Sequence, residues 1–454
     1  MARIIVLKNA TILHADATVM KHKNIFIENG IISKIEDSNQ EIQREQCSDT
    51  LLNSKENLGN PCEHNCEQEV IDCTHFVITP GIVNMHTHAA MSLFKGIAED
   101  VSSDRWFNEI IWPYESKVDE HDVYIGTKLA IAEMIDCGVT TFSDHYFFED
   151  AVYKAVEEAG IRAVIAPTLF GSAANFEERI DNTVSFIKEK KGKSDRIELR
   201  MGPHAPYTCP TPTLQRIIEE AKRLGVGIHL HVSENVPQVE KCIRENKKTP
   251  FGMIDEAGGF DIPCLVAHGS YIREEDLKYL KEDTWFATCP KTYMKLSSGT
   301  GNLYQLRSQL QYSFGTDGAA SSNSLNPLEQ ARLFALIGKY QFDNCEDYTN
   351  KEIWQALMRG HKAFGFHSGQ IQEGWNADLV IWDLKRANTY PVYNPVTSIL
   401  YSADSTNVHD TMVGGTFLKR NGELVLDLTQ LYKEANELKK EMLKRGKGKA
   451  NVVY

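Results

Sequence analysis

The beginning of the chain alternates short apolar runs with polar turns, which is the pattern of β-strands. Two such runs, residues 23–28 and 31–35, flank Asn29-Gly30, a pair that favours a type I′ hairpin turn. Between residues 38 and 68 the chain becomes polar and rich in Asn, Glu and Gln, and we expect an exposed loop there. This part of the chain therefore predicts a β-rich segment with one hairpin and one long loop.

From about residue 80 to residue 365 the pattern changes, because short apolar runs now alternate with helical stretches. This alternation is typical of parallel strands joined by crossover helices. Helices are expected at 123–137 and at 213–224, where apolar residues recur at helical spacing. The eight candidate strands cover residues 82–85, 139–143, 163–166, 197–201, 227–231, 264–268, 285–288 and 312–317.

Beyond this region, residues 377–382 and 411–417 again have the pattern of strands. Each segment is too short to bury its own core, so we expect both to join the N-terminal strands in one small β domain. A last helix is expected around residues 431–442, which carry an apolar stripe. The lysine-rich tail from Lys444 to Lys449 is expected to be frayed and solvated.

These patterns predict a fold of the α/β class. Residues 80–369 are predicted to form a (β/α)₈ barrel of the TIM type. Residues 1–79 together with residues 370–454 are predicted to form a small β-sandwich domain. The length of 454 residues accommodates a barrel and an accessory domain of this kind.

Composition and charge limit the classes of partner. The net charge of −13 argues against nucleic acid or an anionic membrane as the main partner, and favours a small ligand. No stretch reaches the roughly 18 consecutive apolar residues of a membrane span, and the apolar run at the start is too short for a signal peptide. The ten cysteines are scattered, and no second ligand pair follows Cys62 and Cys66 to make a structural zinc site. We expect a cytoplasmic protein.

The strongest chemical feature is the stretch Pro-Gly-Ile-Val-Asn-Met-His-Thr-His at residues 80–88, on the first barrel strand. Residues two apart in a strand point to the same side, so His86 and His88 are expected to face the barrel interior together. A single His-x-His pair is weak evidence for a metal site. It gains weight because polar residues recur at the ends of other candidate strands.

His231 closes the fifth candidate strand and is followed by Glu234, while His268 ends the sixth strand and Asp317 the eighth. The C-terminal ends of barrel strands converge, so these side chains are expected to meet although they lie far apart in the sequence. Three imidazoles and one carboxylate suit zinc or iron(II), which both accept nitrogen and oxygen ligands. The alternative is a set of unrelated polar residues that end buried strands, and the recurrence at four strands argues against it.

These motifs resemble those of the amidohydrolase superfamily and, within it, the 5′-methylthioadenosine/S-adenosylhomocysteine deaminases. The resemblance covers nearly the whole chain and is carried by residues 80–88, 315–325 (Gly-Thr-Asp-Gly-Ala-Ala-Ser-Ser-Asn-Ser-Leu) and 373–380 (Glu-Gly-Trp-Asn-Ala-Asp-Leu-Val). It implies a homo-oligomer, since members are often dimers or tetramers. It also implies one divalent metal ion, zinc or alternatively iron, bound by His86, His88, His231 and Asp317.

The same resemblance implies that Glu234 and His268 act on water and substrate. A metal lowers the pKa of water that it binds, Asp317 accepts a proton from the water, and His268 holds the attacking oxygen by a hydrogen bond. Glu234 protonates the ring nitrogen as the oxygen adds to the adjacent carbon, and ammonia then leaves. The fourth strand segment, residues 198–204, lacks the lysine that bridges two metals in other branches, so a single metal is expected.

Further residues are implied on the substrate side. Glu115 matches an acid that accepts hydrogen bonds from both ribose hydroxyls, and His204 matches a histidine that contacts the purine or the attacked centre. Trp112, with Phe94 and Trp106, is expected to line an apolar pocket for the base. The implied substrates are adenosine-type nucleosides, namely 5′-methylthioadenosine, S-adenosylhomocysteine or adenosine.

Two positions depart from the family pattern and leave the exact substrate open. Pro167 stands where members acting on S-adenosylhomocysteine typically have an arginine for the amino-acid carboxylate, and Thr292-Tyr293 stands where Ser-Asn is usual. One alternative is another hydrolase of the superfamily, a guanine or pterin deaminase or a triazine chlorohydrolase. Guanine deaminases carry Arg-Phe where this chain has His204-Ala205, which argues against guanine. A non-catalytic metal-binding scaffold is the other alternative, and the two proton-transfer residues argue against it.

Overall fold

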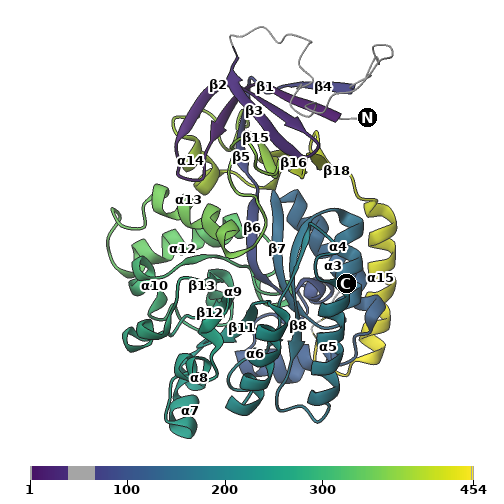
Figure 1. The fold of residues 1–454 in the computed structure, drawn as a ribbon, viewed down its shortest axis with the longest axis vertical. Coiled ribbons are helices and arrows are strands. Elements are labelled where there is room, and N and C mark those ends of the chain that lie inside the picture. Colours follow the sequence, from purple (N-terminus) through teal and green to yellow (C-terminus); the bar gives the residue numbers. More distant parts are fainter. Residues whose placement is uncertain (1–2, 39–66, 451, 453–454) are drawn as a thin grey trace, which may run out of the picture.

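The computed structural model describes residues 3–38, 67–450 and 452. Most of the expected polar loop, together with Cys62 and Cys66, lies outside the described residues. Figure 1 shows a β-rich part, built from both ends of the chain, above a larger part in which helices surround strands. Within the described residues, no helix is long and apolar enough to cross a membrane.

The β-rich part forms a nine-stranded sheet among the described residues, in the order β18-β17-β16-β15-β5-β1-β2-β3, with β4 also paired to β1. Strand β5 links the two ends of the chain, because it pairs parallel with β1 and antiparallel with β15. The predicted hairpin joins β2 and β3, and Asn29 and Gly30 have the positive φ angles, 50° and 84°, that a type I′ turn requires. The strands are β1 (Arg3–Leu13), β2 (Val19–Glu28), β3 (Ile31–Asp37), β4 (Glu67–Asp72), β5 (Phe76–Pro80), β15 (Leu379–Asp383), β16 (Val408–Val413), β17 (Thr416–Arg420) and β18 (Glu423–Leu424).

This terminal sheet has an apolar core of its own. Ile5, Ile25, Ile78, Leu379 and Ile381, from strands at both ends of the chain, belong to one buried cluster. The expectation that both ends share one β structure is confirmed. The hydrogen bonds form one continuous sheet, so a separate β-sandwich is not confirmed. The division into domains at residues 1–79 plus 370–454 and 80–369 stays a prediction.

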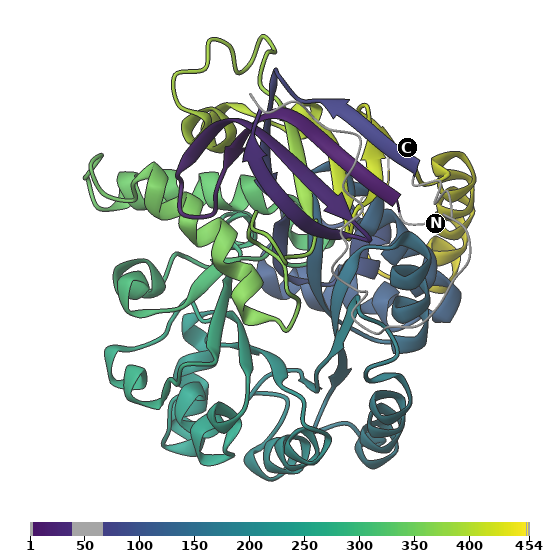
Figure 2. The ribbon, with the colours of Figure 1, turned by 45° about the horizontal axis from the view of Figure 1, so that its top comes forward.

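The eight predicted barrel strands are present, and the terminal sheet lies across one end of them (Figures 1 and 2). A bridge between Met201 and Ile228 joins the fourth strand to the fifth. The amides of Thr316 and Asp317 donate to the His86 carbonyl at 2.9 and 3.0 Å, which closes the eighth strand on the first. The strands are β6 (Ile82–Thr87), β7 (Val139–Tyr146), β8 (Arg162–Leu169), β9 (Ile197–Leu199) with β10 (Gly202–Pro203), β11 (Ile228–Val232), β12 (Cys264–His268), β13 (Thr284–Thr288) and β14 (Tyr312–Phe314).

Helices cover the outside of these strands, as the alternating pattern predicts. The helix expected at 123–137 begins earlier, because Asp119 and Asp122 form a capping box at its N-terminus. The helix expected at 213–224 also begins earlier, since Pro212 is tolerated in a first turn. The main helices are α3 (Glu120–Asp136), α4 (Glu149–Ala159), α5 (Phe176–Lys190), α6 (Thr211–Leu224), α7 (Val236–Asn246), α8 (Pro250–Glu256), α12 (Pro327–Gln341), α13 (Asn350–Met358) and α15 (Leu428–Arg445).

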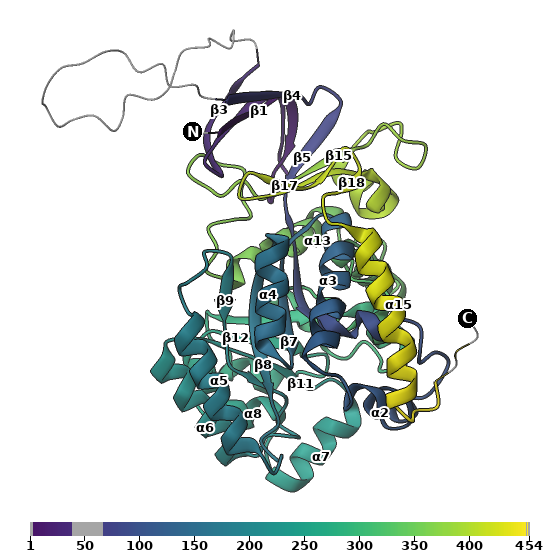
Figure 3. The same ribbon diagram turned by 90° about the vertical axis from the view of Figure 1, so that its right-hand side faces the viewer.

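The end of the chain differs from expectation. Helix α15 packs its apolar stripe against α3, where Leu431 and Leu438 join a buried cluster with Ile125 (Figure 3). The stretch from Lys444 to Lys449 was expected to be frayed and solvated. Its lysines are exposed, but the expectation of fraying is wrong. The Lys449 amide donates to the Glu109 carbonyl at 2.9 Å, so the tail is docked on the barrel domain. Backbone contacts to a distant segment are not visible in a local charge pattern.

A buried ion pair connects the barrel to the terminal sheet. Arg162, the first residue of β8, donates from Nε and Nη2 to the Asp378 carboxylate at 2.6 and 3.2 Å. The side chains are only 3% and 0% exposed. Asp378 also accepts the Gly414 amide at 2.7 Å, so one carboxylate joins the first residue of a barrel strand to the turn between β16 and β17. Such a pair is well satisfied only while both partners are present.

Replacing Arg162 with Met should destabilise the fold by about 3–5 kcal/mol, because it leaves the Asp378 carboxylate buried without a counter-ion. Denaturant and thermal unfolding of the purified variant measure this loss. Arg386→Met is the matched control, since Arg386 pairs with Asp383 but is 41% exposed. Its effect should stay within about 1 kcal/mol. Equal losses in the two variants would contradict a special role for the buried pair.

Candidate metal centre and active site

The predicted metal residues meet at the C-terminal ends of the barrel strands. His86 and His88 lie at the end of β6, His231 lies in β11, and Asp317 follows β14. One ring nitrogen from each histidine lies within 4.8 Å of the others. The two Nε2 atoms of His88 and His231 are 3.2 Å apart. Asp317 Oδ1 lies 3.4 Å from His88 Nε2 and 3.8 Å from His86 Nε2.

Backbone carbonyls determine which nitrogens of two of these rings carry protons. His88 Nδ1 lies 2.6 Å from the carbonyl oxygen of His145, and His231 Nδ1 lies 2.8 Å from that of His204. A carbonyl only accepts, so both Nδ1 atoms donate and each neutral ring presents a lone pair at Nε2. Two lone pairs facing each other at 3.2 Å repel and cannot form a hydrogen bond. A cation between them removes the repulsion, so the donor set fits a divalent metal.

His86 is held by a histidine that the sequence analysis missed. The His86 Nδ1 atom lies 2.9 Å from His229 Nε2, and His229 Nδ1 lies 3.1 Å from the Ser143 hydroxyl. His86 Nε2 is buried and has no hydrogen-bond partner among the described residues. Such a nitrogen is costly unless a ligand satisfies it. The signal was available, because His229 precedes His231 by two residues in a strand and therefore shares its face.

Burial keeps these imidazoles neutral. Desolvation lowers the pKa of His86, His229 and His231 well below its usual range, and the neighbouring histidines lower it further, because two adjacent rings do not readily carry positive charge together. The pKa of His204 falls to about 3, chiefly through burial and secondarily because His88 lies nearby. Neutral imidazole is the form that binds a metal, so the buried surroundings favour coordination.

The backbone is left-handed at two of the predicted catalytic residues. Asp317 has a φ of 61° and His268 a φ of 68°, which is uncommon for residues other than glycine. Local bonds hold the aspartate in this conformation, because its Oδ1 accepts the Gly318 amide at 2.7 Å and its Oδ2 accepts the Ser321 hydroxyl at 3.1 Å. Strained residues of this kind cluster at functional sites.

Tyr293 orients the His268 ring. Tyr293 lies in α9 (Pro290–Lys295), and its hydroxyl oxygen accepts the Cys289 amide at 2.9 Å and lies 3.2 Å from His268 Nδ1. Because the oxygen already accepts from the amide, its own proton is available for Nδ1. With the hydroxyl as the donor, a neutral His268 ring carries its proton on Nε2. The departure from the family pattern at Tyr293 thus supports a predicted catalytic residue.

Glu234 is the carboxylate predicted to transfer protons. It accepts a hydrogen bond from the Tyr207 hydroxyl at 3.2 Å, a partner that the sequence analysis missed. Burial raises the pKa of Glu234, His268 partly offsets the effect, and the charge of Asp317 adds to it. A carboxyl group with a raised pKa keeps its proton closer to neutral pH, which suits a proton donor.

Two of the predicted substrate residues lie on one short helix between β6 and α3. Glu115 ends α2 (Trp112–Glu115) and is buried. Burial raises the pKa of Glu115, while His88 and Tyr146 lower it. Trp112 is 40% exposed, and its ring meets Phe170 edge-on with centroids 6.5 Å apart.

His204 also packs against Phe170. The ring centroids of His204 and Phe170 are 4.5 Å apart, and His204 Nδ1 lies 2.9 Å from the Thr208 hydroxyl. Phe170 therefore adds an aromatic surface beside the histidines that the sequence analysis did not identify. Phe94 is only 1% exposed and packs in the main core rather than lining an open pocket. Trp106 donates its indole N–H to a backbone carbonyl at 3.3 Å.

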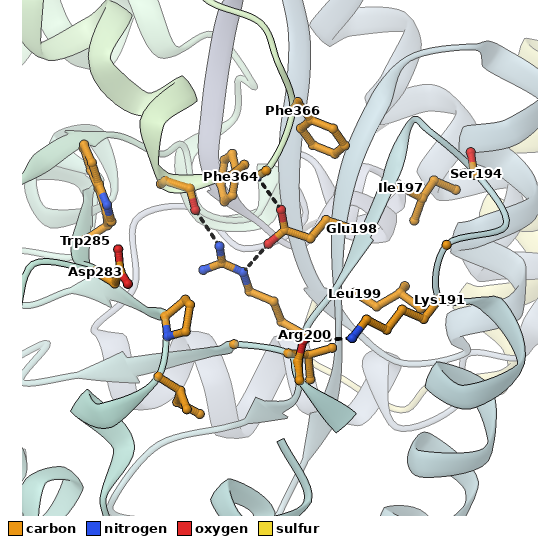
Figure 4. Close-up of a pocket in the computed structure, with 18 of the residues that line it drawn as sticks. Lys191, Ser194, Ile197, Glu198, Leu199, Arg200, Asp283, Trp285, Phe364 and Phe366 are labelled. Carbon is orange, nitrogen blue, oxygen red and sulfur yellow. Dashed lines mark hydrogen bonds and ion pairs between the residues drawn. The ribbon is translucent and has the colours of Figure 1, made fainter. Parts of the chain in front are cut away.

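A large cavity lies at the opposite end of the strands (Figure 4). It has a volume of about 860 Å³, and the beginnings of barrel strands line it, among them Ile197 and Gly227. Within it, Arg200 donates to the Glu198 carboxylate at 2.9 Å and to the Ala363 carbonyl at 2.5 Å. No predicted metal or catalytic residue lines this cavity. Chemistry in (β/α)₈ barrels belongs to the C-terminal ends of the strands, so the histidine cluster marks the candidate site.

Solved structures similar to this chain share its fold. An adenosine deaminase from Xanthomonas campestris with bound zinc has a TM-score of 0.86 and 23% identity, covering 97% of this chain and 98% of its own. Atrazine chlorohydrolase from Arthrobacter aurescens, complexed with zinc, has a TM-score of 0.83 and 17% identity, covering 96% of this chain and 100% of its own. The likeness and the histidine-rich site together support a divalent metal.

Proteins of similar sequence give more specific information than these solved structures. A protein of Dictyoglomus thermophilum named 5-methylthioadenosine/S-adenosylhomocysteine deaminase is 37% identical over 382 residues, which cover 83% of this chain and 90% of that protein. Residues 77–418 match the amidohydrolase family. The match spans the barrel and the strands on both sides of it. With a metal-type donor set at the ends of its barrel strands, this chain belongs to the amidohydrolase family.

Proposed function

We propose that this chain is a metal-dependent hydrolase that deaminates adenosine-type nucleosides, with 5′-methylthioadenosine, S-adenosylhomocysteine and adenosine as candidate substrates. One observation carries the proposal: ring nitrogens of three histidines and the Asp317 carboxylate meet in one site, and the His268 ring packs against two of these histidines. Its amidohydrolase family membership supports the reaction class. The name of the Dictyoglomus relative supports the substrate class.

The proposed metal ligands are His86, His88, His231 and Asp317, and the proposed ion is zinc, with iron(II) as the alternative. A divalent ion held there supplies Lewis-acid chemistry and makes water a better nucleophile at neutral pH. The chain contributes the fixed orientation of the rings. The carbonyls of His145 and His204 hold two of them, and His229 holds the third.

The other side chains move protons. Asp317 accepts a proton from the attacking water, and its hydrogen bonds from Gly318 and Ser321 keep the carboxylate in place. His268 donates from Nε2 to the incoming oxygen, because Tyr293 occupies its other nitrogen. Glu234, a buried carboxyl group whose pKa is raised, acts as the proton donor to the ring nitrogen beside the attacked carbon. Asp317 then passes its proton to the amino group, which leaves as ammonia, and the proton of the remaining hydroxyl restores Glu234 as the C=O bond forms.

Glu115, Trp112 and His204 are the proposed substrate-binding residues. A buried carboxylate has a desolvation cost that two ribose hydroxyls offset by donating to it. Free bases and triazines lack these hydroxyls, so Glu115 favours a nucleoside over the alternative substrates, which are guanine, pterins and chlorinated triazines. Pro167 ends up at the C-terminal part of β8 and offers no charge to an amino-acid tail.

The cellular compartment and the partners of the protein are part of the same proposal. All described cysteines are free, and most are buried, which fits a reducing compartment such as the cytoplasm. The net charge of −13 argues against nucleic acid and anionic membranes as partners. A homo-oligomer is expected by analogy with the family.

Purified protein should contain close to one equivalent of zinc or iron per chain, measured by elemental analysis. The double variant His86→Asn with His88→Asn should lose it, because two of the four ligands are removed. His121→Asn is the control, since this histidine is exposed on α3 and far from the cluster in sequence. Two equivalents in the parent protein, or full metal retention in the double variant, would refute the ligand assignment.

Glu234→Gln should keep the metal and the fold but reduce turnover by about 10²–10⁴-fold, because an amide cannot deliver a proton. Ammonia release from adenosine and metal content are measured on the same preparation. Glu245→Gln, an exposed position on α7, serves as the matched change and should leave turnover unaltered. Near-normal ammonia release by Glu234→Gln would remove this residue from the mechanism.

Adenosine and 5′-methylthioadenosine should be better substrates than adenine, and they should match or exceed S-adenosylhomocysteine in kcat/KM. The first expectation rests on Glu115 as a ribose acceptor, the second on the uncharged Pro167. Kinetics on the four compounds, repeated with Glu115→Gln, test both. In this variant the difference in kcat/KM between adenosine and adenine should be smaller than in the parent protein. Activity confined to free bases would overturn the role of Glu115 in ribose binding. A strong preference for S-adenosylhomocysteine would show that the uncharged Pro167 does not limit binding of the amino-acid tail.

A further inference from the structure

The end of the chain packs on the segment that carries two proposed substrate residues. Residues 106–115 lie between β6 and α3 and comprise a π-helical turn, η2 (Trp106–Ile111), followed by α2. In Figure 3 helix α15 descends along α3 and ends beside α2. The tail beyond it, residues 446–449, continues over this segment. Sequence analysis gave the tail no role.

Hydrogen bonds join the tail to the segment at two places. The Tyr114 hydroxyl donates to the Gly448 carbonyl at 2.9 Å. The Lys449 amide donates to the Glu109 carbonyl at 2.9 Å, and the Lys449 ammonium lies 3.1 Å from the Glu109 carboxylate. Bonds that use backbone groups of the tail depend on its path rather than on its lysines. These backbone hydrogen bonds explain why the tail has a defined position although its sequence has little tendency to form regular structure.

Packing around Tyr114 is equally specific. A Cβ atom at Gly446 would come within 2.1 Å of the Tyr114 ring, and one at Gly448 within 2.4 Å of its other edge. The two glycines thus allow the tail to pass on both sides of the ring, which is only 5% exposed. Arg445 anchors the start of the tail, because its guanidinium pairs with buried Asp122 at 2.7 Å.

The inner face of the segment is anchored in the main core by Ile110 and Ile111, whereas its outer face has little other cover. Phe107 and Trp112 are 42% and 40% exposed, so the outer surface of the segment has little cover. A π-helical turn is also uncommon and appears often at functional sites. Glu115 directly follows Tyr114, so any shift of the tyrosine moves the carboxylate proposed to meet the ribose. Contacts from the tail therefore act on the geometry of substrate binding.

We propose that residues 446–449 form a clamp that positions Glu115 and Trp112 for substrate binding, an inference that rests on the proposed function. The clamp does not touch the metal ligands, which lie on the barrel strands. Its loss should therefore affect KM more than kcat and should leave the metal in place. The residues of the clamp are positioning residues, acting through Tyr114.

Two variants test the clamp. The first ends the chain after Arg445. The second is Gly446→Ala, whose backbone angles of −81° and 151° suit alanine, so that the only conflict is with the Tyr114 ring. Lys447→Ala is the matched control, because this side chain is exposed in the same tail. Both test variants should raise the KM for adenosine about tenfold, the effect of losing one well-packed hydrogen bond. Metal content should not change.

Amide hydrogen exchange supplies a readout that needs no substrate. Exchange within residues 106–115 should be faster in both test variants than in the parent and in Lys447→Ala, whereas exchange in β6 and β11 should be unchanged. Unchanged exchange in residues 106–115 would overturn the clamp. Faster exchange with an unchanged KM would overturn its role in substrate binding. If the parent deaminates no nucleoside, the proposed function fails, and hydrogen exchange alone decides whether the clamp exists.

Discussion

Two imidazole lone pairs that face each other at 3.2 Å in a buried site are the constraint on which the rest of this active site depends. Neither ring can turn to relieve the contact, because each Nδ1 is committed to a backbone carbonyl. Burial also lowers the pKa of His231, which disfavours relief of the contact by protonation of that ring. The protein therefore maintains an arrangement that is unfavourable by itself and that a divalent cation makes favourable. Preorganisation of this kind limits the conformational cost of binding the ion.

The barrel makes such an arrangement possible. Parallel strands end at one edge, and closure of the sheet brings the first strand beside the eighth, where the amide of Asp317 bonds to the carbonyl of His86. Asp317, near the end of the barrel sequence, is thus joined to His86, near its beginning, by a backbone hydrogen bond. The left-handed conformation of Asp317 is the cost of this approach, and hydrogen bonds to its carboxylate offset it. At the opposite ends of the strands, Arg200 and Glu198 only tie the barrel together.

Both ends of the chain support the barrel from outside. The buried pair of Arg162 and Asp378 joins the start of a barrel strand to the terminal sheet, so the sheet and the barrel share a polar contact that neither satisfies alone. At the other end of the molecule residues 446–449 pass over Tyr114 and contact the segment that carries Glu115. Residues late in the chain therefore contact and support parts of the barrel that precede them by more than 200 residues in the sequence.

Local pattern was sufficient for much of this protein. Short apolar runs between helical stretches located all eight barrel strands, and the Asn29-Gly30 pair located the hairpin, because both signals are properties of neighbouring residues. The spacing of His86 and His88 and the positions of His231, His268 and Asp317 at strand ends indicated the metal centre, since strand ends converge in any such barrel. His229 was within reach of the same reasoning, because it shares a strand face with His231.

Other features were decided by tertiary structure. Only the closed barrel places the carbonyls of His145 and His204 against ring nitrogens, and so determines which nitrogens keep lone pairs. Tyr207 and Tyr293 meet Glu234 and His268 across loops from different strands. The tail after Arg445 looked like a solvated run of lysines, yet its backbone and two glycines dock on Tyr114. Sequence periodicity reports which face of an element is buried, whereas these contacts depend on the distance between elements, which only the packed chain determines.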